Sequence, residues 1–545
     1  MRNEAPWMAG FVWHLDFVVP PGTIAAMEKC FYVTTAIDYV NGQPHLGHAY
    51  EKVITDVMAR AHRSLGEKVF FLTGLDEHGQ KVQQAAMAEG KNPQVYCDGL
   101  AESWQGLARK LGLTNDDFVR TTQLRHKTVV QAILSKLHAE GQFYKETHKG
   151  FYSTSAESFL TEKDRLPDGT FDPGYGKVIE LEEENYYFKL KEHQDWLIGH
   201  IEKNPGFISP DSRRNEVLGF LKNNELEDLC ISRPAARLNW GIPIPFDNDY
   251  VTYVWFDALV NYISIPFAQG DPVLRKALPA EAGAEPGTPL QLWPADLHVI
   301  GKDILKFHAV FWPIMLKAMN LPLPKTILTH GWWQKDGEKL SKSTGNVVDP
   351  IAVIDEWGLD AFRYYVVREL AIGPDGNWTD AGFRSRYQAE LANGLGNLVN
   401  RSLSMIKRYR NGLVPAGTNR LEKEISEAWT RVIAAYRANA LQEALMECGA
   451  LVTKANQYID QTSPFKMAKD PARAEELNDI LRTLAEVCRV LATLMWPVIP
   501  GVAERIHCQL GFPPTGTSLA QTTPSTPVDH PIGEIFPLFP RKDEK

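Results

Sequence analysis

The chain has 545 residues, which is enough for about three or four domains of roughly 150 residues each. Hydrophobic residues make up 44% of it and charged residues 23%, proportions that are typical of a soluble globular protein. The formal net charge of −9 excludes a globally basic nucleic-acid-binding chain, although a local basic face can still bind an anionic partner.

The cysteines and the apolar runs bear on the cellular compartment. Six cysteines are scattered without a C-x-x-C pair, which predicts neither a disulfide framework nor a zinc knuckle and favours a reducing cytoplasm. No run reaches the ~18 apolar residues that a membrane span needs. We therefore expect a cytoplasmic protein without a membrane partner.

Residues 1–26 precede the organised pattern, which begins just after Met27. The apolar stretch 7–19 is broken by His14 and Asp16, and it lacks a strongly basic beginning and a clear small-residue cleavage site. We interpret residues 1–26 as an extension or a misassigned start outside the core, and a targeting segment is the alternative.

Residues 27–140 alternate between strand-like and helix-like segments. Residues 31–35 and 69–73 are aromatic and β-branched, as expected of buried strands, and helical patterns follow each of them. This alternation predicts the first half of a doubly wound parallel sheet of the Rossmann type. Ligands of such sheets bind at the carboxyl ends of the strands, where Tyr39 and Asp76 are expected.

The sequence His45-Leu46-Gly47-His48 follows the first strand at the predicted start of a helix. The two histidines share one helical face, and Gly47 presents no side chain to an approaching ligand. Free N–H groups at a helix start suit a phosphate, and imidazole donors can follow charge that develops on it. Two histidines that only cap a helix remain an alternative for this motif taken alone.

The alternation of strand-like and helix-like segments stops near Gly141. Residues 141–245 contain short aromatic strands and turns, which predicts an inserted α+β domain that splits the sheet. The α/β pattern resumes over residues 246–330 as the second half of the same Rossmann-type sheet.

Residues 331–383 contain the polar loop Lys339-Leu340-Ser341-Lys342-Ser343 and a connecting region. An exposed polar turn is the alternative for this loop taken alone. Residues 384–512 form long amphipathic segments, which predict an all-α helix bundle. Residues 513–545 are rich in Pro and Thr and are expected to form an extended or disordered tail.

The two motifs together resemble the HIGH and KMSKS signatures of class I aminoacyl-tRNA synthetases. Their order, on either side of a split α/β domain and before a helix bundle, strengthens the resemblance. It implies amino-acid activation with ATP, in which negative charge grows on the phosphates and catalysis is mainly positioning and electrostatics. His45 and His48 would then hold the α-phosphate side, and Lys339 and Lys342 would hold the β- and γ-phosphates.

Longer blocks resemble methionyl-tRNA synthetases from about residue 31 to residue 510. They include VTTAIDYVNGQPHLGHAY, FLTGLDEHG, VTYVWFDALVNY, HVIGKDILKFHAVFWP and KLSKSTGNVVDP. The resemblance implies a nucleotide site at Gly47, Gly301, Asp303 and Lys342, with ATP entering together with Mg. It also implies a methionine pocket, in which Asp76 pairs with the substrate ammonium, lined by Ala36, Ile37, Tyr39, Asp76, Trp255, Leu259, Tyr262, Ile304 and His308. Aromatic walls suit the flexible, polarizable thioether chain.

The same resemblance implies that the connecting region of residues 331–383 contacts the tRNA stem. It also implies that the bundle recognises the anticodon of tRNA(Met), including the initiator tRNA. The matching positions are Asn393, Asn397, Arg401, Pro464 and Phe465. Many relatives bind zinc through C-x-x-C knuckles in the inserted domain, whereas residues 152–156 read Tyr-Ser-Thr-Ser-Ala. Because Ser and Ala are not zinc ligands, we predict no zinc. We find no appended oligonucleotide-binding domain of the kind that many relatives use to dimerise, so we expect a monomer.

The main hypothesis is an enzyme that activates L-methionine with ATP and transfers it to the 2′-hydroxyl at the 3′ end of tRNA(Met). A catalytically inactive, synthetase-like tRNA-binding protein is the alternative from another class. A class I synthetase for a different apolar amino acid is the second alternative.

Overall fold

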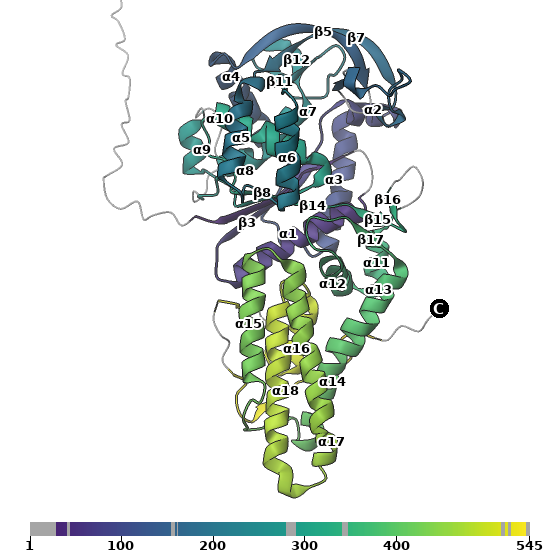
Figure 1. Ribbon diagram of the computed structural model, residues 1–545, viewed down its shortest axis with the longest axis vertical. Helices are drawn as coiled ribbons and strands as arrows, with labels where there is room; N and C mark the ends of the chain where they lie inside the picture. Colours follow the sequence, from purple (N-terminus) through teal and green to yellow (C-terminus); the bar gives the residue numbers. More distant parts are fainter. Residues whose placement is uncertain are drawn as a thin grey trace, which may run out of the picture.

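Within the residues that the structure describes, seven strands form a parallel sheet at the centre of the α/β part of the chain (Figure 1). The computed structural model describes residues 29–40, 44–153, 158–160, 162–278, 290–340, 347–513, 518–520 and 525–540. The strand order is β2-β3-β1-β13-β14-β8, and β4 pairs with β3. Their bounds are β1 (Phe31–Thr35), β2 (Asp38–Tyr39), β3 (Val69–Asp76), β4 (Asp117–Arg120), β8 (Ile208–Ser209), β13 (Leu297–Gly301) and β14 (Thr326–His330).

Helices cover both faces of this sheet because its strands are apolar on both sides. Val33 and Phe71 pack in the same core cluster as the helix after β1, whereas the adjacent Tyr32 and Phe70 belong to a second cluster on the opposite face. The covering helices are α1 (Leu46–Ser64), α2 (Gln80–Ala88), α3 (Pro93–Lys110), α4 (Leu124–Ala139), α7 (Val254–Leu259), α8 (Asn261–Ala268), α9 (Pro272–Ala277), η4 (Lys302–Ile304), η5 (Phe307–Phe311) and α10 (Trp312–Ala318). The predicted doubly wound α/β fold is confirmed.

The segment between the two halves of the sheet is dominated by a long antiparallel ribbon, drawn as an arch at the top of Figure 1. Its elements are β5 (Phe143–Ser153), β6 (Ser158–Leu160), η1 (Glu162–Asp164), η2 (Pro173–Tyr175), β7 (Val178–Phe188), η3 (Lys191–His193), α5 (Gln194–Lys203), α6 (Asp211–Asn223), β9 (Leu229–Cys230), β10 (Ser232–Pro234), β11 (Pro243–Ile244) and β12 (Asp247–Thr252). One part of the segment differs from the predicted separate insert, because Ile208 and Ser209 of β8 pair in parallel with β14 of the main sheet. A two-residue strand is too short to leave a periodic signal in the sequence.

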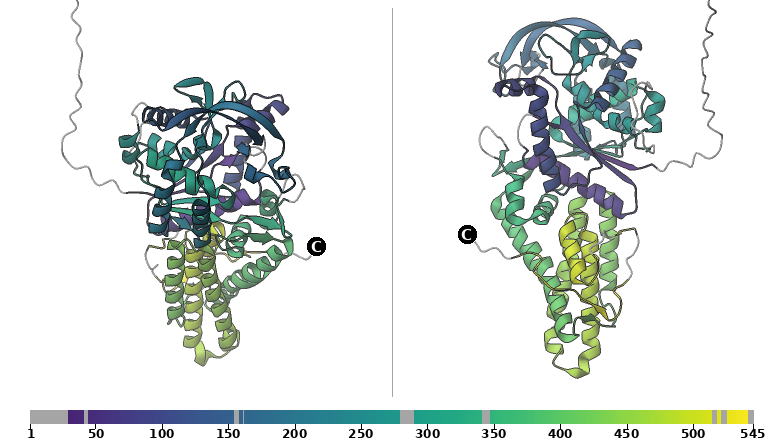
Figure 2. Two further views of the ribbon diagram at one scale, coloured as in Figure 1. Left: turned by 45° about the horizontal axis from the view of Figure 1, so that its top comes forward. Right: turned by 180° about the vertical axis from the view of Figure 1, so that it is seen from behind.

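The second part of the structure is a tall helix bundle below the sheet (Figure 2). A small sheet of β15 (Trp333–Lys335), β16 (Glu338–Lys339) and β17 (Gly376–Trp378) leads into it. The helices are α11 (Pro350–Trp357), α12 (Leu359–Glu369), α13 (Asp380–Arg386), η6 (Tyr387–Gly396), α14 (Asn397–Tyr409), α15 (Glu422–Arg437), α16 (Leu441–Thr462), α17 (Pro464–Met467), η7 (Pro471–Arg473), α18 (Ala474–Met495) and α19 (Pro500–Gln509). No helix in the described ranges has both the length and the apolar composition that a membrane crossing requires.

The described part of the C-terminal tail is packed against the bundle, so the prediction of an extended or disordered tail is wrong for these residues. β19 (His530–Pro531) pairs with β18 (Leu413–Val414), and the Tyr387 hydroxyl donates a hydrogen bond to the Pro540 carbonyl over 2.8 Å. Leu519, Leu538 and Phe539 are buried in the main core cluster. These three apolar side chains anchor a segment whose overall composition is polar and proline-rich.

Candidate functional site

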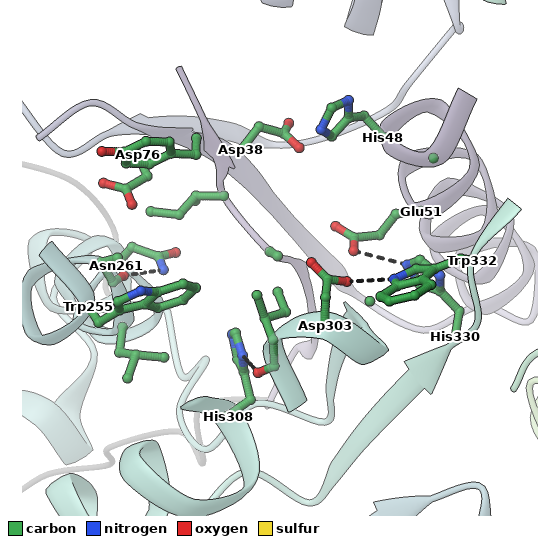
Figure 3. A pocket seen from close by; sticks show the side chains of 18 of the residues that line it. Asp38, His48, Glu51, Asp76, Trp255, Asn261, Asp303, His308, His330 and Trp332 are labelled. Carbon is green, nitrogen blue, oxygen red and sulfur yellow. Dashed lines mark hydrogen bonds and ion pairs between the residues drawn. The ribbon is translucent and has the colours of Figure 1, made fainter. Parts of the chain in front are cut away.

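A cavity of about 460 Å³ lies at the carboxyl ends of β1, β3, β13 and β14 (Figure 3). The cavity is lined by all nine residues predicted to contact methionine, and by His45, Gly47, His48, Gly301 and Asp303. Asp76 and Trp255 lie at one end of it, and His48 and Glu51 lie at the other. Lys342 falls outside the described residues, and only the backbone of Lys339, in β16, is described.

The two histidines of the H-x-G-H motif form the N-terminal cap of α1. His45 Nδ1 accepts the Gly47 N–H, and His48 Nδ1 accepts the His45 N–H, each over 3.1 Å. The two rings stack with their centroids 3.8 Å apart. Because both Nδ1 atoms act as acceptors, each neutral ring carries its proton on Nε2. The histidines thus cap the helix and also line the cavity, so their capping role does not exclude a role in phosphate binding.

Two glycines keep the cavity open where backbone and side chains meet. A Cβ atom on Gly47 would lie 3.1 Å from Cε1 of His45, and one on Gly301 would lie 2.6 Å from Oδ1 of Asp303. Asp303 in turn accepts the Trp332 indole N–H over 3.1 Å. Substitution of either glycine would therefore displace a polar group of the site.

Aromatic rings build the opposite end of the cavity. Trp255 stacks on Phe307 with 3.6 Å between centroids. Tyr262 and His308 are buried, and the Tyr262 oxygen lies 2.8 Å from His308 Nε2. Burial lowers the pKa of His308 to about 4, so the ring is neutral near pH 7. Its Nδ1–H donates to the Ile304 carbonyl over 2.9 Å, so Nε2 accepts the Tyr262 hydroxyl proton.

A buried ion pair joins the two ends. Asp38 of β2 lines the cavity, and its carboxylate lies 2.6 Å from Nζ of Lys52, which follows His48 by one turn of α1. Burial raises the pKa of Asp38 to about 6, against the opposing effect of Lys52. The ion pair thus connects β2, which borders the aromatic end of the cavity, to α1, which carries the histidines.

Comparisons with known proteins agree with this arrangement. The family model described as "tRNA synthetases class I (M)" matches residues 31–170 and 175–403. Methionine–tRNA ligases of Bacillus subtilis and Rhizobium meliloti are each 40% identical to this chain. Each match covers 94% of this chain, and it covers 78% of the Bacillus subtilis protein and 98% of the Rhizobium meliloti protein. The chain belongs to the methionine–tRNA ligase family of class I tRNA synthetases. A solved Mycobacterium tuberculosis methionyl-tRNA synthetase in complex with methionyl-adenylate superimposes with a TM-score of 0.86 at 36% identity, covering 94% of this chain and all of that one.

Several residues that line the cavity were not expected from the sequence. Glu51, His330, Trp332 and Asn261 all line it. Glu51 Oε2 lies 3.1 Å from His330 Nε2, across 279 residues of sequence. Such a pair leaves no local signal, although the polar His330-Gly331 at the end of a strand of a parallel sheet is a usable cue.

The predicted anticodon residues lie far from the cavity, along the bundle. Asn393 lies within the π-helical stretch η6, Asn397 begins α14, and Arg401 of α14 pairs with Asp460 of α16 over 2.8 Å. Pro464 opens α17, and Phe465 beside it is 46% exposed. The structure thus places these residues on neighbouring helices, with an exposed ring among them.

The predicted absence of zinc concerns a strand that the structure describes only in part, since residues 154–157 lie outside the described ranges. Among the residues that are described, no group of three or more His, Cys, Asp or Glu side chains is placed to hold a metal ion. Ser153, which is described, donates its hydroxyl to the Tyr175 carbonyl over 2.6 Å.

Proposed function

We propose that this chain is a methionine–tRNA ligase. It forms methionyl-adenylate from L-methionine and ATP and then transfers the methionyl group to tRNA(Met). One observation carries this proposal: a single cavity has an aromatic end next to a buried carboxylate and a histidine-capped helix N-terminus at the other end. An amino acid and a nucleotide phosphate can therefore meet inside it.

The aromatic end suits methionine. Trp255 and Leu259 offer apolar surface to an unbranched thioether, and the neutral His308 ring, held by Tyr262, adds a polar group without a charge. Asp76 is 6% exposed and ends β3 at the rim of the same cavity. A carboxylate there pairs with the substrate ammonium, which orients the reacting carboxylate toward the other end.

The phosphate end suits the α-phosphate of ATP. A methionine carboxylate oxygen attacks the α-phosphorus, the bond to the β-phosphate oxygen breaks, and pyrophosphate leaves. The Nε2–H groups of His45 and His48 and the N-terminus of α1 stabilise the charge that develops on the phosphate oxygens. The ammonium groups of Lys339 and Lys342 contact the β- and γ-phosphates and stabilise the negative charge of the departing pyrophosphate. Mg is part of the substrate, bound to ATP, and would neutralise part of its charge.

The second step uses the adenylate as an activated mixed anhydride, whose acyl–phosphate bond breaks. The 2′-hydroxyl at the 3′ end of the tRNA attacks the methionyl carbonyl carbon, and AMP leaves. The helix bundle recognises the anticodon through Asn393, Asn397, Arg401 and the exposed Phe465 ring, which stacks on an unpaired base. We place the enzyme in the cytoplasm as a monomer that serves both initiator and elongator tRNA(Met).

Exchange of labelled pyrophosphate into ATP tests the function directly. We expect exchange that depends on L-methionine, and we expect isoleucine and leucine to support it poorly. Absence of exchange with every amino acid would leave the tRNA-binding alternative. Exchange with leucine or isoleucine but not with methionine would assign the chain to another class I synthetase.

A further inference from the structure

A buried carboxylate, Asp257, lies directly behind the amino-acid end of the cavity. It follows Trp255 by two residues on α7, so the two side chains leave the helix on different sides. Trp255 lines the cavity, whereas Asp257 is fully buried and does not line it. His78 likewise follows the cavity residue Asp76 by two positions and is 1% exposed.

Two histidines from different elements hold Asp257. His78 Nδ1 lies 2.6 Å from one carboxylate oxygen, and His126 Nε2 of α4 lies 2.7 Å from the other. Burial by itself raises the pKa of Asp257, but the two histidines outweigh burial and lower the pKa to about 2. Asp257 is therefore an ionised acceptor, and both ring N–H groups donate to it.

The same network reaches a third element of the cavity. His126 Nδ1 lies 2.9 Å from the hydroxyl of Ser264 on α8, the helix that also carries Tyr262. Through two histidines, Asp257 is thus connected to the end of β3 and to α8, while its own helix carries Trp255. The three elements that supply the ammonium-binding carboxylate, the indole wall and the tyrosine share one buried anchor.

The surroundings of His78 leave it little room to move. The Trp240 indole N–H donates to the Glu77 carbonyl over 2.5 Å, and the Trp240 ring meets the His78 ring edge-on at 5.5 Å. The Glu77 carboxylate is buried and accepts from Arg120 of β4 over 2.6 Å. In the sequence Asp76-Glu77-His78, one residue faces the cavity and the next two fix the strand end from behind.

We propose that Asp257 is a positioning residue for the amino-acid pocket. By accepting from His78 and His126, it sets the separation of Asp76 from Trp255, and so the orientation in which the methionine carboxylate is presented. A misplacement of about 1 Å in such a site can cost on the order of 10²-fold. Loss of Asp257 should affect the binding of methionine rather than that of ATP, because the Asp257 network contacts only the elements that build the aromatic end of the cavity.

This inference rests on the proposed methionine activation, and steady-state pyrophosphate exchange tests it. We expect Asp257→Asn to raise the KM for methionine by about 10- to 100-fold and to change the KM for ATP by less than about threefold. Asp271→Asn is the matched control, because Asp271 is an equally buried carboxylate that accepts four backbone N–H groups away from the cavity. We expect that control to lower stability without a selective change in the KM for methionine.

A second pair of variants keeps the test decisive if Asp257→Asn does not fold. In His78→Asn the side-chain amide N–H takes the place of the ring Nδ1–H and can still donate to Asp257, whereas His78→Ala has no donor there. We therefore expect the KM for methionine to stay closer to wild type in His78→Asn than in His78→Ala. Equal increases in the KM for methionine and ATP, or no difference between the Asn and Ala variants, would overturn the inference. A wild-type enzyme without methionine-dependent exchange would instead refute the proposed function itself.

Discussion

His48 has two roles in the structure, and one substitution separates them. Its Nδ1 accepts the His45 N–H and caps α1, while its Nε2–H is the donor assigned to the phosphate. In His48→Asn the amide oxygen takes the place of Nδ1, so the cap is kept and the donor at Nε2 is lost. In His48→Ala both are lost.

The two losses differ in size and in readout. One preorganised donor to developing charge is worth about 2.7–4 kcal/mol, which is a factor of about 10²–10³ in rate. One helix cap is worth about 1 kcal/mol of folding free energy. We therefore expect His48→Asn to lower the pyrophosphate-exchange kcat about 10²–10³-fold with near-wild-type unfolding in urea and an unchanged methionine affinity.

His48→Ala should lose a similar factor in rate and also about 1 kcal/mol of stability. The reasoning is refuted if His48→Asn exchanges at close to the wild-type rate while His48→Ala is inactive, because His48 would then act only as a cap. Parallel losses of exchange and methionine binding in His48→Asn would also contradict it, since they would mean that the residue only shapes the pocket.

Three further predictions follow from the ion pair, the bundle and the inserted segment. Burial raises the folded-state pKa of Asp38 to about 6, so the stability that the protonated carboxyl contributes is present at low pH and is lost as pH rises through 6. Lys52→Met should therefore destabilise the protein in urea more at pH 7.5 than at pH 5.5. The double variant Asp38→Asn/Lys52→Met, which removes both charges, should be neutral or stabilising by about 1–4 kcal/mol. Phe465→Ala should raise the KM for tRNA in charging assays, because a lost base stack weakens binding by ~1–3 kcal/mol, and it should leave pyrophosphate exchange unchanged. Met446→Ala, an exposed control on α16, should change neither the KM for tRNA nor pyrophosphate exchange. Elemental analysis of the purified protein should find no stoichiometric zinc, and one bound equivalent would contradict the inference from Ser153 and Ala156.

Sequence reasoning located the site residues well where the signal is local. Gly47, His45 and His48 act within four residues of one another, so their cap and their place at a strand end follow from helix and sheet geometry alone. The aromatic positions and Gly301, in contrast, came from resemblance to a family, because a single Trp255 or Tyr262 has the appearance of ordinary core.

The features that were missed depend on contacts between distant residues. Lys52 pairs with Asp38 across the H-x-G-H turn, and Glu51 pairs with His330 only after α1 and β14 meet. The tail was misjudged because composition averages over residues, whereas Leu519 and Phe539 are each buried in the core cluster. A two-residue strand such as β8 is created by the sheet that it joins rather than by its own sequence.

The helix α1 connects these observations physically. Its first turn presents His45 and His48 to the cavity, and Asp56 in its third turn is buried against Arg363 of α12 over 2.7 Å. Arg363 also donates to the Pro497 and Val498 carbonyls, at the turn between α18 and α19 of the bundle. A fully buried guanidinium with these partners fixes the bundle to the helix whose first turn lines the cavity, because loss of Asp56 would take the paired carboxylate away from a buried positive charge. The two parts of the molecule are thus joined through the helix whose first turn lines the cavity, rather than through the ribbon on the far side of the sheet.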